Sequence, residues 1–584
     1  MLDVPPRNRI FGARARERAM AKCGPDSWLR EGSLVCAMLG TAAIMLSAFL
    51  VGYSLWYIAK FAFHPLFWDQ WELVRYLASS DFHDVIFFLF ARHNEHVIAT
   101  SKLLYLLDYA LFDLTNIFVL VCSASLQIAN ALLLVSIVFS GYPKNLTFWT
   151  ALAVLSALTL SLSQWENLIW AFQSPFPLVV FFAICTLWSA VRYHDSLALR
   201  GAITWLGVLV LGMAACVFTL GGGAVIPFAV AALLLRLGSP ISKLLAAVVM
   251  GLLLVTALIY ILGNNTGASL AGGIPLPAMV ARFFVVMIGA PLAQDPKWGA
   301  IIGSGLLLVV AAVFFACRSS RDRPILILMA LVLFLLGNVA AAAATRSSFG
   351  IGTAMSPRYS TPILVLWGSV LATGLRAAII GQRRILVFLS VSALLLVAGI
   401  STLRPTPLEW AQRVHRQVAQ AGYFAVSGVK DPALLATLYP SPQILMPLLD
   451  YLQRQQLNIF SPKSLFPAPT ALEILAASHP DASLCQYHAI EAMRVHEHTV
   501  EVNGWLADNS NHEPRFVLLL DGERRLIGFT QPLVERSQVI PSGGAASDLP
   551  GFRLAAPQPS TSDGFLVAIG SPPHAICRLP ILLR

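Results

Sequence analysis

Eleven runs of mostly apolar residues occupy the first 403 residues of this 584-residue chain. A helix that crosses the hydrocarbon core of a membrane, about 30 Å thick, needs about 20 such residues. The runs therefore predict an α-helical polytopic membrane protein with about eleven transmembrane helices. They cover residues 34–58, 116–139, 146–162, 175–191, 202–218, 223–236, 243–262, 299–317, 324–344, 359–375 and 384–402. A twelfth stretch, 277–293, contains Arg282 and has prolines near both ends, so we expect a re-entrant or interfacial segment there.

The scarcity of charge excludes several classes of protein. Charged residues make up only 12% of the chain and hydrophobic residues 57%, with a mean hydropathy of +0.71. An ordinary soluble domain has about 25% charged residues. So few charges cannot cover the surface of a soluble protein of this size, which excludes a cytosolic enzyme, a disordered scaffold and a disulfide-stapled secreted domain.

Basic residues are distributed unequally between the two sides of the predicted membrane. With the N-terminus in the cytoplasm, the cytoplasmic segments up to residue 403 contain eighteen Lys or Arg, whereas the longer opposite loops contain eight. Because basic loops stay in the cytoplasm, residues 1–33 are predicted to be a cytoplasmic tail and residues 404–584 to lie outside. The net charge of +10 is then mainly a topology signal, and no nucleic-acid partner is expected.

The composition changes abruptly after the last apolar run. Residues 404–480 have apolar side chains at helical spacing and many prolines, which predicts an extracytoplasmic helical linker region. Residues 481–584 contain short alternating runs separated by turns, which predicts a small extracytoplasmic β-sandwich domain. Cys485 and Cys577 lie near the two ends of that domain, and either a disulfide or two unpaired thiols is consistent with the sequence.

The first outer loop, residues 60–114, is too long to be a simple connection. Asp69 lies about ten residues after the first span, between two tryptophans. Farther along, His93, Glu95 and His96 form a polar cluster, in which the two histidines would share one face of a helix. A metal site formed by these histidines is one interpretation. We favour substrate hydrogen bonding or a structural turn, because the spacing is not His-Glu-x-x-His.

Two further outer loops contain isolated charged residues. Glu166 has no basic neighbour in its own loop, so it should pair across the fold, bind a cation, or simply face water within an aromatic belt. Arg346 and Arg358, the latter followed by Tyr359, lie in a late outer loop, and Arg282 raises the same question. Arginine suits phosphate because of its forked, permanently charged guanidinium. The alternative is that these arginines are anchors whose charged ends reach the membrane interface.

An acid soon after the first span, a second acid in the next outer loop, a late arginine and a soluble C-terminal domain together resemble the GT-C superfamily. Its members are polytopic glycosyltransferases that use polyprenyl-phosphate sugars, such as protein O-mannosyltransferases, oligosaccharyltransferases and the aminoarabinose transferases of lipid A. The resemblance covers roughly residues 34–403. Short motifs also look like those of a bacterial subgroup of glycosyltransferase-like membrane proteins: Trp68-Asp69-Gln70-Trp71, His93-Asn94-Glu95-His96 and the stretch from Trp165-Glu166-Asn167 through Gln173.

The resemblance implies a role for individual residues. Asp69 matches the first-loop acid, which acts as base or metal partner, and Glu166 matches the second-loop acid. Arg358, together with Arg346, would hold the lipid-linked phosphate. The first-loop pair here is Asp-Gln where O-mannosyltransferases have Asp-Glu, and the second acid is Glu where Asp is common. Dependence on a divalent cation, Mg²⁺ or Mn²⁺ held by Asp69 and Glu166, is therefore left open.

These expectations describe a bacterial inner-membrane enzyme of the cell envelope. It would transfer a sugar from a polyprenyl-phosphate donor to a glycan, lipid or protein, with the polyprenyl tail in a hydrophobic groove beside the outer leaflet. A transporter or flippase of lipid-linked sugars is a weaker alternative, because transporters place polar groups at mid-span. A glycan polymerase or ligase typically has a large late outer loop, which is short here. The loop motifs do not favour a scaffold protein.

Overall fold

The computed structural model describes residues 34–583 except 80–84, 94–95, 197, 247, 250–275, 479–483, 486, 497, 508–513, 534–550, 560 and 571–574. Within these residues, nine helical stretches are long and apolar enough to cross a membrane, so the chain is a multi-pass membrane protein. They coincide with nine of the eleven predicted runs. Their helices are α3 (Leu34–Phe61), α7 (Ile117–Val138), α8 (Leu146–Thr159), α10 (Pro175–His194), α11 (Leu199–Val217), α15 (Pro296–Cys317), α16 (Arg323–Arg346), α17 (Ser360–Ile380) and α18 (Arg384–Leu403).

The remaining apolar runs give shorter helices or fall largely outside the described residues. The run 223–236 gives a 3₁₀ turn, η3 (Gly221–Val225), followed by α12 (Ile226–Leu237), which ends where Gly238 takes a φ of 82°. The stretch 277–293 forms α14 (Pro277–Gly289) and the 3₁₀ turn η4 (Ala290–Leu292). Most of the run 243–262 lies outside the described part of the chain.

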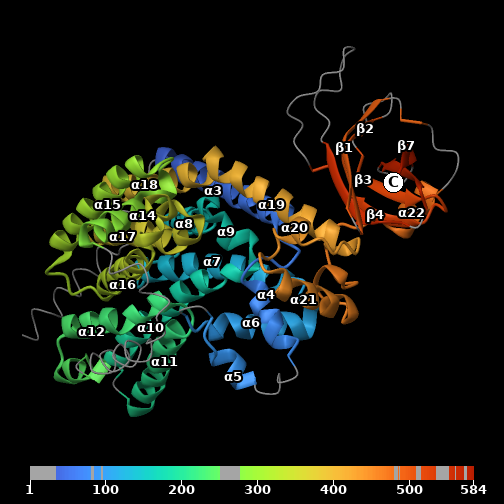
Figure 1. The fold of residues 1–584 in the computed structure, drawn as a ribbon. Coiled ribbons are helices and arrows are strands. Elements are labelled where there is room, and N and C mark those ends of the chain that lie inside the picture. Colours follow the sequence, from blue (N-terminus) through green and yellow to red (C-terminus); the bar gives the residue numbers. More distant parts are fainter. Residues whose placement is uncertain are drawn as a thin grey trace, which may run out of the picture.

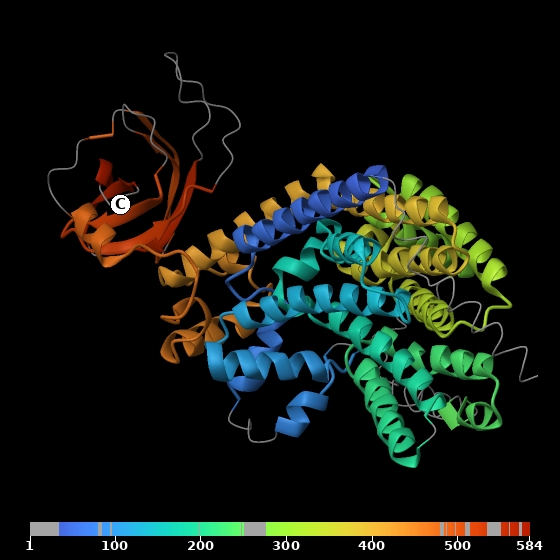
Figure 2. The same ribbon diagram turned by 180° about the vertical axis from the view of Figure 1, so that it is seen from behind.

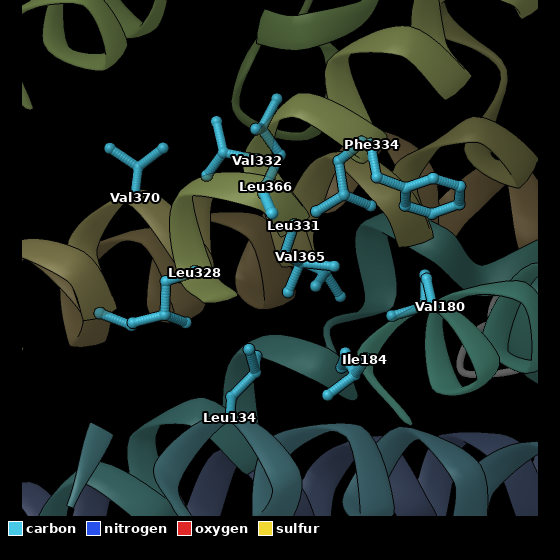
Figure 3. Close-up of a cluster of buried hydrophobic side chains, with 14 of the residues drawn as sticks. Leu134, Val180, Ile184, Leu328, Leu331, Val332, Phe334, Val365, Leu366 and Val370 are labelled. Atoms are coloured by element: carbon cyan, nitrogen blue, oxygen red, sulfur yellow. The ribbon is translucent and has the colours of Figure 1, made fainter. Parts of the chain in front are cut away.

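Four helices build the centre of the helical body. Figure 3 shows side chains of α7, α10, α16 and α17 meeting there, with Leu134, Ile184, Leu331 and Val365 among them. All four are fully or almost fully buried. At one end of these helices the buried Arg376 donates to both carboxylate oxygens of Asp322 and to two carbonyls at the end of α7. This ion pair joins α17 to the start of α16 and to the end of α7.

At the opposite end, the first outer loop folds into short helices. They are α4 (Gln70–Leu77), α5 (Val85–Phe90) and α6 (Ala99–Phe112). The ammonium of Lys102, fully buried, donates to the carbonyls of Phe88 and Ala91 at the end of α5. His93 and His96 pair with each other through their backbones. The expectation that they share a helix face is therefore wrong, because the two residues form an antiparallel bridge.

The second outer loop consists of three short turns, η1 (Leu162–Gln164), α9 (Trp165–Ile169) and η2 (Ala171–Gln173). Three 3₁₀ turns form the late loop before α17, namely η5 (Ser347–Phe349), η6 (Ile351–Met355) and η7 (Pro357–Tyr359). The turns α9 and η1 both contact η7. The second and late loops therefore meet at the same end of the bundle.

Helices continue after the last span. They are α19 (Pro405–Val426), α20 (Pro432–Leu435), α21 (Pro442–Arg454), η8 (Asn458–Phe460) and α22 (Ala471–Ser478). Figures 1 and 2 both show α19 lying along α3, where the Tyr57 hydroxyl donates to the carbonyl of Leu408 at 2.8 Å. Helix α21 packs against α4 of the first outer loop. The segment after the spans is thus part of the helical body.

The chain ends in a β region, as the alternating pattern predicted, and this region stands beside the helices in both views (Figures 1 and 2). Its strands are β1 (Tyr487–His496), β2 (Thr499–Ala507), β3 (Phe516–Asp521), β4 (Leu526–Thr530), β5 (Phe552–Pro557), β6 (Asp563–Ile569) and β7 (Ala575–Leu582). They form two antiparallel sheets, ordered β1-β2-β5 and β4-β3-β6-β7.

Two features hold this β region together. Buried apolar side chains from both sheets form one cluster, which includes Val502, Leu519, Leu554 and Leu566. A disulfide joins Cys485 to Cys577, which resolves the two alternatives left by the sequence. It ties the segment before β1 to β7.

Candidate functional site

Glu166 and Arg358 form an ion pair across the fold. The Nε of Arg358 donates to Oε2 of Glu166 at 2.9 Å. The Glu166 side chain is 12% exposed, whereas 41% of the Arg358 side chain remains exposed. The acid that lacks a basic neighbour in its own loop therefore has an arginine 192 residues later in the chain as its partner.

Neutral polar groups hold this ion pair in place. The amide of Asn167, next to Glu166, donates to the carbonyl of Arg358 at 2.8 Å and to the hydroxyl of Thr361 at 2.7 Å. Thr361 in turn donates to Gln164, which also accepts from Gln127 on α7. All of these amides and hydroxyls are buried. Because buried polar groups are costly unless bonded, the network fixes both loops relative to α7 and α17.

Asp69 lies close to this pair, at the start of α4. Its Oδ1 is 3.9 Å from Nε2 of His93, and 34% of its side chain is exposed. The ring of His93 packs on Phe172 of the second loop, with 5.0 Å between ring centroids. The charge of Asp69 acts on the guanidinium of Arg358. The structure therefore brings together four residues that the sequence nominated: Asp69, His93, Glu166 and Arg358.

Trp170 connects Asp69's helix to the ion pair. Its indole N–H donates to Oε1 of Gln70, the residue after Asp69, at 3.1 Å. The guanidinium of Arg358 lies 6.0 Å from the centre of the Trp170 ring, within the range of a cation–π contact. Gln70 is itself buried and donates to Asn116 at 2.8 Å. The bond between Trp170 and Gln70 thus joins the first and second outer loops at the residue that follows Asp69.

The other nominated residues have varied positions. Gly221 lies against His96, because a Cβ at this glycine would come within 2.5 Å of His96 Nδ1. Tyr359 is half-buried, and its ring lies 6.5 Å from that of Phe176. Arg346, at the end of α16, packs over Phe349. Arg282 is exposed on α14, which packs mainly against α15 and α16. Glu95 lies outside the described residues.

Tyr439 and Glu72 belong to the site but were missed in the sequence. The Tyr439 hydroxyl, which comes from the segment between α20 and α21, donates to Oε1 of Glu72. Glu72 also pairs with Arg75 at 3.3 Å. Burial and the neighbouring Glu72 carboxylate raise the pKa of Tyr439 to about 12, and the charge of Asp69 contributes. No local pattern links residues 367 positions apart, so only the fold reveals this wall of the site.

A mostly apolar groove of about 920 Å³ lies between α3, α15 and α18. Its lining includes Leu46, Ile302, Leu396 and Ile400, with Trp298, Gln294 and Arg404 among the polar or interfacial residues. The guanidinium of Arg404 donates to the carbonyls of Ala290 and Ala293. The α18 wall is joined to the segment before Glu166, because the hydroxyls of Ser161 and Ser401 hydrogen-bond at 2.8 Å.

The arrangement of the acids does not fit a metal ion bridging Asp69 and Glu166. Oε2 of Glu166 is already occupied by Arg358, whose positive charge would repel a cation placed between the two acids. In the described part of the chain no group of three or more His, Cys, Asp or Glu side chains is arranged to hold a metal ion. The positive charge that balances Glu166 is therefore the guanidinium of Arg358.

Comparisons of the chain with protein-family models, curated proteins and solved structures found no match. The functional conclusion therefore depends on the site itself.

The buried carboxyl of Asp108 should make the stability of the protein depend on pH. Asp108 on α6 is fully buried, and its carboxylate accepts from the backbone N–H of Asn116 at 3.0 Å. Burial raises its pKa from 3.8 to about 6. Because the unfolded chain loses this proton first, stability should fall as pH rises from about 4 to about 6, then level off. Asp108→Asn should remove this slope and stabilise the protein by up to ~3 kcal/mol at pH 7.

Thermal unfolding of the purified protein between pH 4 and 7 measures this effect. The difference between wild type and Asp108→Asn isolates the contribution of this carboxyl from that of other titrating groups. Parallel curves for the two proteins would show that Asp108 has an ordinary pKa.

Proposed function

We propose that this protein is an integral membrane glycosyltransferase of the GT-C type. It transfers a sugar from a polyprenyl-phosphate donor to an acceptor of the cell envelope, on the extracytoplasmic face. The observation that supports this proposal most is that Asp69, a partly exposed carboxylate, acts electrostatically on an arginine that Glu166 and Asn167 hold in place. A base and a phosphate-binding cation are the two groups that such a transfer requires.

The chemistry follows from these positions. The donor loses its polyprenyl phosphate as an anion, so a fixed positive charge near the breaking bond stabilises the transition state. Arg358 is bound to Glu166 through Nε, which leaves its two Nη groups for the phosphate. Asp69 accepts the proton of the attacking hydroxyl as general base. Glu166 acts by orienting the guanidinium.

The apolar groove suits the isoprenoid tail. Its lining is mostly apolar, as a lipid site requires, and Arg404 and Gln294 are among its few polar residues. Ser401, a buried residue of α18 that follows the lining residue Ile400, bonds Ser161, five residues before Glu166. The tail would therefore lie in the membrane while the phosphate reaches toward the second outer loop.

We also propose that the enzyme resides in a bacterial inner membrane with its N-terminus in the cytoplasm and its two β sheets packed as an extracytoplasmic sandwich. The unequal distribution of basic residues supports this orientation. The Cys485–Cys577 disulfide supports it as well, because such bonds persist in oxidising compartments.

The position of the charged residues favours an enzyme over a flippase or transporter of lipid-linked sugars. Asp69, Glu166 and Arg358 lie in loops at one end of the helices. Transporters bind their substrates near the middle of the membrane, between broken helices.

Substitution of the two acids tests the proposal. In cells that depend on this protein, Asp69→Asn should slow transfer about 10²–10⁴-fold, as expected for loss of a general base. Envelope glycans should lose one sugar, and the polyprenyl-linked donor should accumulate. Glu166→Gln should give the same change to a smaller extent.

The matched control is Asp195→Asn. Asp195 is also a partly exposed carboxylate paired with an arginine, Arg323, but it lies at the other end of the helices. This variant should leave glycans and donor unchanged. Unaltered glycans and donor pools in both Asp69→Asn and Glu166→Gln, with normal insertion in the membrane, would refute the enzymatic function.

A further inference from the structure

An exposed tryptophan stands beside Asp69 in an unusual backbone conformation. Trp68 has a φ of 49°, a region that bulky residues rarely adopt. Its backbone N–H donates to the carbonyl of Leu438 at 2.8 Å, so the segment before α21 holds the turn in place. The Trp68 side chain is 48% exposed, whereas Trp71 in the next turn is buried and bonded to Leu66.

Charged and hydrogen-bonding side chains lie on α4, which begins two residues after Trp68. Glu72 and Arg75, one and two turns along α4, pair with each other at 3.3 Å, and 62% of the Arg75 side chain is exposed. The Tyr439 hydroxyl donates to the same carboxylate and lies near Asp69. The backbone bond of Trp68 to Leu438 places the exposed ring in the same part of the fold as this carboxylate, guanidinium and phenol, next to the proposed base in the chain.

We propose that Trp68, Glu72, Arg75 and Tyr439 form the acceptor subsite and that the acceptor is a sugar. This inference rests on the proposed function. A pyranose ring has a face of C–H groups, which packs on an aromatic ring, and a rim of hydroxyls, which bond to carboxylate and guanidinium groups. A sugar stacked on Trp68 would bring one of its hydroxyls toward Asp69.

A sugar fits this surface better than a lipid does. A tryptophan that anchors a protein in the membrane interface is amphipathic and needs an apolar neighbourhood on the lipid side. The residues that follow Trp68 on the exposed side of α4 are charged, and the C-terminal helical segment bonds to this region through Leu438 and Tyr439. Membrane anchoring is the competing outcome of the test.

Saturation-transfer NMR on the full-length protein in detergent tests the proposal. The probes are the methyl glycosides of glucose, galactose, mannose, N-acetylglucosamine and arabinose. At least one should bind wild type with a millimolar Kd. Trp68→Leu should weaken that binding at least tenfold, and Tyr439→Phe and Glu72→Gln about threefold to tenfold each. Trp149→Leu is the control. Trp149 is 51% exposed, but it lies near the N-terminus of α8, at the end of that helix away from the second outer loop.

Two results would overturn the acceptor subsite. One is the absence of binding by any of the five glycosides to wild type, and the other is unchanged binding by Trp68→Leu. Weaker reconstitution of Trp68→Leu into phospholipid vesicles with unchanged glycoside binding would identify Trp68 as a membrane anchor.

Asp69→Asn separates this inference from the proposed function. It should lose transfer but keep glycoside binding, because the carboxylate acts on the proton and the ring stacks on Trp68. Normal transfer in Asp69→Asn, together with lost binding in Trp68→Leu, would keep the sugar site and reject Asp69 as the base. The reverse pair of results would keep the enzyme and reject the sugar site.

Discussion

Replacing Arg358 by methionine should lower sugar transfer about 10²–10³-fold, the usual cost of removing one group that stabilises a developing anion. It should also destabilise the protein by about 1–3 kcal/mol, because Glu166 would lose its hydrogen-bonded partner in a poorly hydrated place. The value lies below that of a fully buried pair, since 41% of the Arg358 side chain is exposed. Transfer assays in membranes and thermal unfolding in detergent measure the two effects.

A lysine and a double variant separate the two roles of Arg358. Arg358→Lys can pair with Glu166 or contact the phosphate, but its single ammonium cannot do both, so near-normal stability should accompany a large loss of transfer. Glu166→Gln combined with Arg358→Met leaves no unpaired charge. It should be more stable than the Arg358→Met variant. Simple addition of the two single effects would show that the pair is not coupled, and full activity in Arg358→Met would remove arginine from the mechanism.

Helix positions could be predicted from the sequence because they depend on local properties. A run of about 20 apolar residues is read directly, and nine such runs coincide with long helices. The β region was equally local, since Asp521-Gly522 between two apolar runs does join β3 to β4 as a hairpin. The same reasoning failed for His93 and His96, which form an antiparallel bridge and do not lie one turn apart on a helix.

Single residues of the site could be predicted from the sequence, but their partners could not. Asp69, Glu166 and Arg358 stood out because charge is rare near the apolar runs. Their partners depend on how distant helices pack, as with the 192 residues that separate Glu166 from Arg358. Neutral residues such as Gln70 and Asn167 gave no signal, because amides occur throughout the loops. They were found only once the fold placed them between charged groups.

Removing the disulfide should have the largest effect on the C-terminal region. Cys485 and Cys577 are 92 residues apart. A cross-link that closes a loop of this size stabilises the folded state by ~4–5 kcal/mol in the loop-entropy model. Cys577→Ser should therefore loosen the β sheets, which hydrogen exchange of strands β2, β3 and β6 measures in the full-length protein. Cys317→Ser, at a buried free cysteine in α15, should leave those strands unchanged.

The same bond tests the orientation of the chain. Cytosolic thiols are kept reduced, whereas the periplasm is oxidising. In intact cells, blocking free thiols before lysis should leave Cys485 and Cys577 unmodified, because they are already joined. Both thiols should react after an impermeant reductant is added to spheroplasts under mildly denaturing conditions. If both cysteines are instead found free in unstressed cells, the β region lies on the reducing side. Asp69 and Arg358, which share that side through Tyr439 and the outer loops, could then not meet an extracytoplasmic donor.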